Sequence, residues 1–135
     1  MQTRRLGNTE LDFTTIGLGT WAIGGEKWKF GWGPQNPSEA VDGILAGLEL
    51  GINWIDTAPV YGDGESENLV GQVLKQTTRN DVLVATKCSR KVLPDGSVTG
   101  ILDARSVQAE CEQSLKRLGV ETIDLYQMHW PEPDN

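Results

Sequence analysis

Short apolar runs alternate with stretches of helical spacing along the 135 residues of the chain. The apolar runs predict strands at residues 16–19, 52–55, 81–87 and 122–128. The 3.6-residue periodicity predicts helices at residues 36–51, 65–75 and 104–119. Two short segments around a Gly-Asn turn in residues 3–16 predict a β-hairpin ahead of the first strand. The predicted order is a hairpin followed by β-α-β-α-β-α-β.

Capping residues indicate where the first and third helices begin and end. Asn36 is a good N-cap, Pro37 suits the first helical position, Glu39 stands where a capping box needs an acid, and Gly51 ends the helix. Asp103 is expected to cap the third helix. We expect its buried face to be an apolar stripe that includes a cysteine: Val107, Cys111, Leu115 and Leu118.

Strands that recur at intervals of about 30–40 residues, with helices between them, predict a parallel sheet of right-handed βαβ units. The segment 81–87 is apolar on both faces, as inside such a sheet. Residues 20–35 are expected to be irregular, and a loop containing Gly and Pro is expected before Asp103. The chain is long enough for a small doubly wound sheet, and it is equally suited to half of a (β/α)₈ barrel.

Composition narrows the classes of function. The chain is 38% hydrophobic and 23% charged, which fits one globular domain. Its net charge of −7 argues against nucleic acid or an anionic membrane as a partner, and no apolar run is long enough to span a bilayer. Two cysteines, Cys88 and Cys111, are too few for a disulfide scaffold, so we expect a reducing cytoplasm. With one histidine, a zinc site is not expected.

Four residues with acid–base chemistry stand at or just after the ends of three successive strands. Asp56 ends the second strand, Tyr61 lies in the loop after it, Lys87 ends the third and His129 follows the fourth. Ligands of parallel α/β folds bind at the carboxyl ends of the strands, so these side chains are expected to meet there.

The chemistry of such a group follows from its charges. A phenol is ordinarily too weak an acid to give up a proton readily at neutral pH, and a nearby ammonium group favours the phenolate. Lys87 is costly to bury alone, and Asp56 on the adjacent strand offsets that cost. His129 is placed to hydrogen-bond a substrate oxygen or to share the proton of Tyr61. The set predicts a reaction that needs one proton.

Other interpretations of single features remain. Each of the four residues has an ordinary structural explanation when it is taken alone. The segment "GLGTWA" matches the dinucleotide fingerprint, but no helix can begin in "IGGEKWKFGWGP", so we predict no Rossmann site. Trp21 and Trp130 are expected either to wall an apolar pocket or to pack in the core. Cys88 is expected to be an ordinary thiol, and Lys87 as a Schiff-base amine is a weaker alternative.

Nearly the whole chain resembles the N-terminal half of an aldo-keto reductase. The resemblance rests on "RRLGNTELDFTTIGLGTW", "GINWIDTAPVYGDGESENLVGQVL", "VLVATK" and "ECEQSLKRLGVETIDLYQMHWP". The "DTAPVYG" segment and the spacing of the four polar residues are its most specific features. The sequence is most similar to the bacterial and plant members related to potassium-channel β subunits.

The resemblance implies a (β/α)₈ barrel whose floor is closed by the hairpin, and hydride transfer between NADP(H) and a small aldehyde or ketone. It implies that Tyr61 is the general acid, that Lys87 and Asp56 tune it and that His129 orients the carbonyl. It places four residues near the nicotinamide end of the cofactor: Gly19, Thr20, Trp21 and Asp56. It places Trp21 and Trp130 at the substrate pocket.

The sequence stops after the fourth predicted strand, whereas the resemblance implies four more that carry most of the cofactor site. We therefore expect residues 1–135 to be the N-terminal half of one barrel domain with no internal boundary. Three arrangements are open: a fragment of a full reductase, two copies that pair, or completion by a separate C-terminal half. A non-enzymatic regulatory or binding subunit is the alternative function. The identity of the substrate is not predicted.

Overall fold

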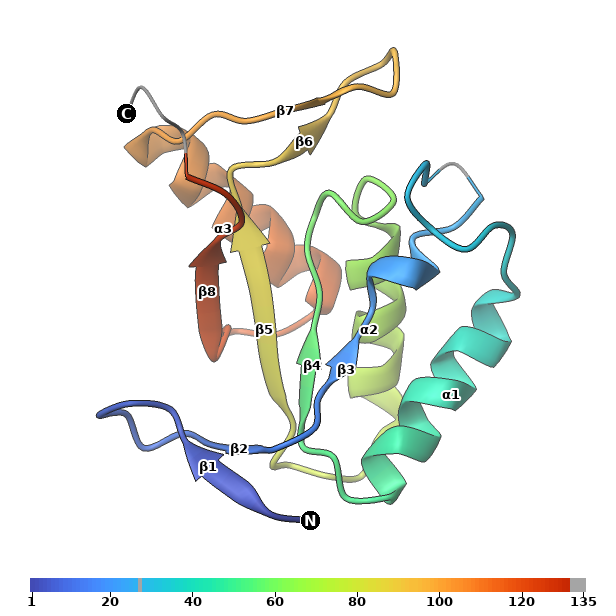
Figure 1. Ribbon diagram of the computed structural model, residues 1–135, viewed down its shortest axis with the longest axis vertical. Helices are drawn as coiled ribbons and strands as arrows, with labels where there is room; N and C mark the ends of the chain where they lie inside the picture. The colour runs from blue at the N-terminus through green and yellow to red at the C-terminus, as the bar shows by residue number, and fades with distance from the viewer. Residues whose placement is uncertain (27, 132–135) are drawn as a thin grey trace.

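The computed structural model describes residues 1–26 and 28–131 and contains a four-stranded parallel sheet (Figure 1). Its strands lie in the order β3 (Leu18–Gly19), β4 (Trp54–Asp56), β5 (Leu83–Cys88) and β8 (Leu125–Met128). All three neighbouring pairs are parallel, which confirms the predicted sheet. Lys27, in the stretch predicted to be irregular, and residues 132–135 of the closing segment lie outside the described residues.

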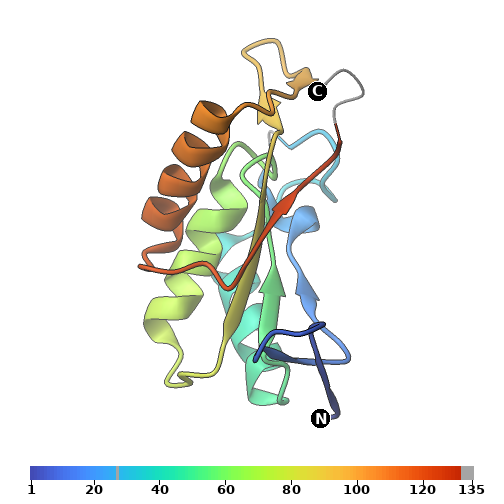
Figure 2. The same cartoon turned by 90° about the vertical axis from the view of Figure 1, so that its left-hand side faces the viewer.

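Three helices follow the first three strands of this sheet: α1 (Pro37–Glu49), α2 (Glu65–Gln76) and α3 (Ala104–Leu118). They cover the same face of the sheet, as the two perpendicular views show (Figure 2). A doubly wound sheet reverses its strand order and carries helices on both faces. The sequential strand order and the one-sided helical layer are instead those of a section of a (β/α)₈ barrel.

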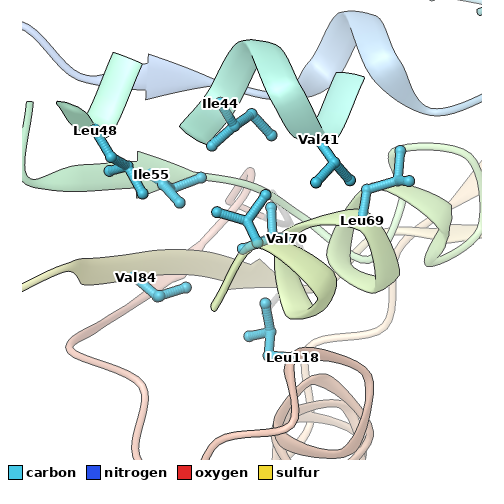
Figure 3. Packing of buried hydrophobic residues seen from close by; sticks show 9 residues of the cluster. Val41, Ile44, Leu48, Ile55, Leu69, Val70, Val84 and Leu118 are labelled. Atoms are coloured by element: carbon cyan, nitrogen blue, oxygen red, sulfur yellow. The ribbon is translucent and has the colours of Figure 1, made fainter. Parts of the chain in front are cut away.

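The core lies between the sheet and the helices (Figure 3). The helices and strands contribute nine fully or nearly fully buried aliphatic side chains, which are Val41, Ile44, Leu48, Ile55, Leu69, Val70, Val73, Val84 and Leu118. Each such side chain stabilises the fold by about 1.5–3 kcal/mol relative to exposure. This layer holds the strands in register, and the register sets where their carboxyl ends stand.

The first helix begins as predicted, but its capping box is absent from the hydrogen bonds of the described residues. The Asn36 side chain accepts from the Ser38 backbone N–H at 3.0 Å, and Pro37 occupies the first helical position. Because the cap is bonded to the second helical residue, Glu39 does not complete the reciprocal pair. A capping box is found at α3, where Asp103 accepts from the Ser106 N–H at 2.8 Å and the Ser106 hydroxyl accepts in return.

The buried face of α3 differs from the prediction. The residues that are fully or nearly fully buried are Glu110, Ser114 and Leu118, whereas Val107, Cys111 and Leu115 are partly exposed. The prediction that Cys111 is buried is therefore wrong. The polar residues that α3 buries have partners: Glu110 accepts from the Ser89 N–H at 2.9 Å, and Ser114 accepts from Arg117, which pairs with the completely buried Glu67 of α2. Contacts of this kind lie between residues far apart in the sequence, so hydrophobic periodicity within the helix cannot anticipate them.

Two short elements were not predicted. The loop before α3 contains a hairpin, β6 (Lys91–Val92) and β7 (Val98–Thr99), which stands above the carboxyl end of β5 (Figure 1). The stretch predicted to be irregular contains a 3₁₀ helix, η1 (Trp21–Ile23). Strands of two residues show no alternation of side chains, so the hairpin has no period to detect.

The N-terminal hairpin is confirmed as β1 (Thr3–Arg5) and β2 (Asp12–Thr14). It is fastened to the amino end of β4, because Asn53 accepts from the Thr14 N–H at 2.8 Å and the Trp54 indole donates to the Thr14 carbonyl at 2.9 Å. It therefore lies at the end of the sheet opposite the carboxyl ends of the strands (Figure 1). Within the described ranges, no helix is long and apolar enough to cross a membrane.

Candidate active site

The carboxyl ends of β4 and β5 bring Asp56, Lys87 and Tyr61 into direct contact. In the parallel register Asp56 stands opposite Ala85, and Lys87 lies two residues farther along β5 on the same face. Lys87 Nζ lies 2.8 and 2.9 Å from the two carboxylate oxygens of Asp56, 3.0 Å from the Thr57 carbonyl oxygen and 3.2 Å from the Tyr61 hydroxyl. The predicted contact between acid, amine and phenol is therefore present.

The ion pair at the centre of this group is mostly shielded from water. The Lys87 side chain is 13% exposed and that of Asp56 is 32% exposed. An ammonium group at such a place needs compensating acceptors, and the carboxylate, the carbonyl and the phenol supply them. The lysine is thereby held as a fixed cation beside the tyrosine.

Close contact between two loops fixes Tyr61. Gly62, which follows it, has φ +70°, and a Cβ atom at Gly62 would lie 1.7 Å from the carbonyl oxygen of Gly24. Only glycine fits such an approach. The Tyr61 backbone is bonded on both sides, because its N–H donates to Ala58 at 3.1 Å and its carbonyl accepts from the Ser66 N–H at 3.2 Å. The phenol is thus presented by a tightly packed turn.

His129 completes the group from the end of β8. Its backbone N–H donates to the Cys88 carbonyl at 3.1 Å, and its ring lies edge-on to that of Tyr61 with 5.6 Å between centroids. Burial, followed by the positive charges of Lys87 and Arg90, lowers the pKa of His129 from 6.5 to about 4. The imidazole is therefore neutral at physiological pH. Its buried Nδ1 has no hydrogen-bond partner among the described residues.

A pocket of about 660 Å³ opens beside Tyr61 and His129. Its remaining lining comes from the loop after β3, the turn before Tyr61, the base and second strand of the β6–β7 hairpin, and the segment after β8: Trp28, Phe30, Val60, Arg90, Val98, Thr99, Gly100 and Trp130. Arg90 stacks over the Trp130 ring at 5.6 Å. The pocket thus places three aromatic side chains, those of Trp28, Phe30 and Trp130, beside the polar group.

The other residues singled out in the sequence lie nearby in different roles. Trp130 lines the pocket, but Trp21 does not; Trp21 is 42% exposed and contacts Trp32. Gly19 ends β3 opposite Asp56 and is exposed. The side chain of Thr20 is engaged, because Thr20 is 1% exposed and its hydroxyl donates to the Asp56 carbonyl at 3.0 Å.

Two further questions about this site concern the reactivity of the Cys88 thiol and the grouping of residues that could hold a metal ion. Cys88 is 3% exposed, and burial together with the carboxylate of Glu110 raises the pKa of its thiol, which confirms the prediction of an ordinary thiol. In the part of the chain that the structure describes, no cluster of three His, Cys, Asp or Glu residues is suited to a metal ion.

Sequence reasoning missed several residues around the site. Trp28 and Phe30 face the pocket from the irregular stretch, and its concentration of tryptophan was the available signal. Arg90 and the β6–β7 hairpin had no such signal. Three buried hydroxyl groups, those of Thr20, Thr57 and Ser66, connect the strand ends to α2. Threonine and serine are common everywhere, so this network could not be recognised before the strands were placed.

Comparison with known proteins gives one consistent family. The model of the aldo/keto reductase family matches residues 15–135. The chain is 42% identical over 134 residues to the aldo-keto reductase YhdN of Bacillus subtilis (strain 168), covering 98% of this chain and 39% of that protein. It is 42% identical over 135 residues to the NADH-specific methylglyoxal reductase of Escherichia coli (strain K12), covering 93% and 40%. The chain thus spans about 40% of the length of these curated relatives.

Solved structures give the same result. The glycerol dehydrogenase AKR11B4 from Gluconobacter oxydans superposes with a TM-score of 0.85 at 39% identity, covering 98% of this chain and 40% of that one. An aldo-keto reductase from Klebsiella pneumoniae in complex with NADPH superposes with a TM-score of 0.67 at 28% identity, covering 90% and 37%. These matches and the sheet order confirm the predicted fold, the N-terminal half of a (β/α)₈ barrel.

Proposed function

Because the chain belongs to the aldo/keto reductase family, we propose that it carries the proton-donating half of an NADP(H)-dependent oxidoreductase that reduces aldehydes or ketones to alcohols. The observation that carries the proposal is the contact of 3.2 Å between Lys87 Nζ and the Tyr61 hydroxyl, beside the pocket. In this proposal Tyr61 is the general acid.

The direction of that contact supports the role of Tyr61. An ammonium group has only donors, so the phenol oxygen accepts from Lys87 and keeps its own O–H to donate elsewhere. Tyr61 lines the pocket, so that proton is available to a carbonyl oxygen there. After the proton has left, the phenolate remains beside a fixed cation, which stabilises it.

The reaction balances with one hydride and one proton. When bound, NADPH would supply the hydride for the new C–H bond at the carbonyl carbon. Tyr61 gives its proton to the carbonyl oxygen, and Lys87, held by Asp56, stabilises the resulting phenolate until it takes up a proton from water. His129, neutral at physiological pH, offers one N–H with which it orients the carbonyl.

The residues proposed to hold the cofactor are those at the end of β3 together with Asp56. The backbone of Gly19 and the ring of Trp21 are exposed there and fit a nucleotide that approaches from the carboxyl end of the sheet. Thr20 is proposed to support this end of the site from behind, because its hydroxyl and its backbone N–H both donate to the Asp56 carbonyl and the residue is 1% exposed. We propose NADP(H) because a structural relative is a complex with NADPH. A curated relative that is NADH-specific makes NADH the competitor to test.

The substrate pocket is proposed to take a small carbonyl compound, with Trp130 in its wall. Residues 1–135 are proposed to be one half of a single barrel domain without an internal boundary, located in the cytoplasm. We propose that the barrel forms in one of three ways: with the rest of a longer protein, with a second copy or with a separate C-terminal half.

Titration of the purified 135-residue chain with NADPH, followed by cofactor fluorescence with light scattering on the same sample, tests the proposal. The expected result is saturable binding by a species of defined size, with NADPH consumed once a small aldehyde such as methylglyoxal is added. NADH is titrated in parallel. Saturable NADPH binding without consumption in the presence of a range of aldehydes and ketones would contradict the reductase function and favour a binding subunit.

A further inference from the structure

Three buried hydroxyl groups form a chain behind the candidate active site. Ser66 Oγ lies 2.7 Å from Thr20 Oγ1 and 3.0 Å from Thr57 Oγ1. The exposed fractions of the three residues are 1% for Thr20 and 0% for both Thr57 and Ser66. They come from three elements, since Thr20 follows β3, Thr57 follows β4 and Ser66 lies in the first turn of α2.

The direction of this chain follows from the number of protons. Thr20 Oγ1 donates its single proton to the Asp56 carbonyl at 3.0 Å, so towards Ser66 it acts as acceptor. The single proton of Ser66 is then donated to Thr20, whose Oγ1 lies at 2.7 Å and whose carbonyl oxygen lies at 3.1 Å, and this leaves Thr57 as the donor to Ser66. The hydrogen bonds therefore run from Thr57 through Ser66 and Thr20 to the main chain of Asp56. Such a chain strengthens cooperatively in a buried place.

Each end of the chain is attached to the catalytic group. Asp56, which receives the last hydrogen bond, pairs with Lys87, and the carbonyl of Thr57, which starts the chain, accepts from Lys87 Nζ at 3.0 Å. The backbone N–H of Ser66 donates to the Tyr61 carbonyl at 3.2 Å. Ser66 is thus bonded directly to the Thr57 side chain and the Tyr61 backbone, and through Thr20 to the Asp56 carbonyl.

We propose that Ser66 is a positioning residue, whose hydroxyl fixes the backbone of Asp56 and Thr57 and so holds Lys87 against the Tyr61 hydroxyl. The inference rests on the proposed function, because it explains what holds Lys87 in contact with Tyr61 for the proposed reaction. Removal of the hydroxyl leaves Thr57 without an acceptor in a dry place, and the strand ends then shift to find one. Ser66 itself touches neither substrate nor cofactor in this proposal.

The test is an NMR measurement on the chain, which has only two tyrosines. Tyrosine labelled with ¹³C at Cζ gives two signals, assigned with Tyr126→Phe. The Lys87→Met variant shows where the Tyr61 signal lies when the ammonium contact is lost. Ser66→Ala is expected to move the Tyr61 signal from its parent position towards that reference. Ser114→Ala is the matched control, because Ser114 is also 0% exposed but lies on α3, and it is expected to leave the signal in place.

Ser66→Ala and Ser114→Ala are both expected to lower the urea midpoint, so stability alone does not decide the question. A Tyr61 signal that stays at its parent position in folded Ser66→Ala would overturn the inference, as would an equal displacement in Ser114→Ala. If Ser66→Ala does not fold, Thr57→Val is measured instead, because this substitution removes the first hydroxyl of the hydrogen-bonded chain with little change of shape. A displaced Tyr61 signal in Thr57→Val supports the inference, and an unmoved signal overturns it.

A kinetic measurement separates this inference from the proposed function. In the form of the protein that reduces carbonyls, Ser66→Ala is expected to lower kcat about tenfold while the Kd for NADPH stays at the parent value. The NMR displacement needs no turnover. If the Tyr61 signal moves but no carbonyl is reduced, the proposed function fails and the positioning role of Ser66 stands. If carbonyls are reduced but the Tyr61 signal does not move, the proposed function stands and the positioning role of Ser66 fails.

Discussion

The depressed pKa of His129 makes the stability of the fold depend on pH in a definite direction. In the folded chain this pKa is about 4, because the ring is partly buried and faces Lys87 and Arg90, whereas in the unfolded chain it is 6.5. At pH values between these two pKa values, His129 is mostly protonated in the unfolded chain and mostly neutral in the folded chain. Stability is therefore fully present above about pH 6.5 and is lost as the pH falls towards about 4.

The size of the effect follows from the same two values. A gap from 6.5 to about 4 corresponds to at most about 3 kcal/mol. The ring is partly exposed, so solvent screening reduces this to about 1–2 kcal/mol. Carboxylates also titrate in this range and add their own slope. The contribution of His129 is therefore the difference between the parent and a His129→Gln variant, whose side chain does not titrate.

The assay is urea unfolding of both proteins at a series of pH values above and below the predicted window. The stability advantage of the parent over His129→Gln is expected to shrink by about 1–2 kcal/mol as the pH falls through the window. NMR of the single histidine reports its pKa directly. In Lys87→Met that pKa is expected to rise, because a positive charge beside the ring has been removed. Parallel pH profiles for the two proteins, or a parent histidine that titrates near 6.5, would refute the reasoning.

Two further predictions concern packing around the site. Gly62→Ala is expected to destabilise the chain by about 2 kcal/mol or more, because the new Cβ would meet the Gly24 carbonyl and φ is +70°. Urea unfolding measures this loss of stability against the control Gly43→Ala, whose Cβ would meet no atom within 4 Å, and equal losses in the two variants would contradict the close contact. Cys88 is expected to react with iodoacetamide much more slowly than the partly exposed Cys111, because burial hinders access to the Cys88 thiol and raises its pKa. Peptide mass spectrometry after partial alkylation measures the two reaction rates, and equal rates would contradict the burial of Cys88.

The order of strands and helices could be predicted because each long element has a clear period and a clear end. The strand ends could then be compared, and Asp56, Lys87 and His129 stood out because ionisable residues are unusual after apolar runs. That comparison was enough to bring Tyr61 together with Lys87, which the structure places 3.2 Å apart.

The features that sequence reasoning missed depend on packing between elements rather than on period. The buried face of α3 includes Glu110, which accepts from the Ser89 N–H, and a single helix cannot reveal such a partner. The β6–β7 hairpin is too short to show alternation. The hydroxyl chain through Ser66 links residues 46 positions apart, so it becomes visible only after the strands are paired.

The most direct test of the central claim compares carbonyl reduction by Tyr61→Phe and by Tyr126→Phe at saturating NADPH. Tyr126 lies on β8 away from the ion pair, with its hydroxyl 3.4 Å from the Val107 carbonyl. We predict that Tyr61→Phe lowers kcat by about 10²–10⁴ while the Kd for NADPH is unchanged, and that Tyr126→Phe keeps the parent kcat. Parent-like turnover by Tyr61→Phe, or a loss of NADPH affinity as large as the loss of turnover, would contradict the account.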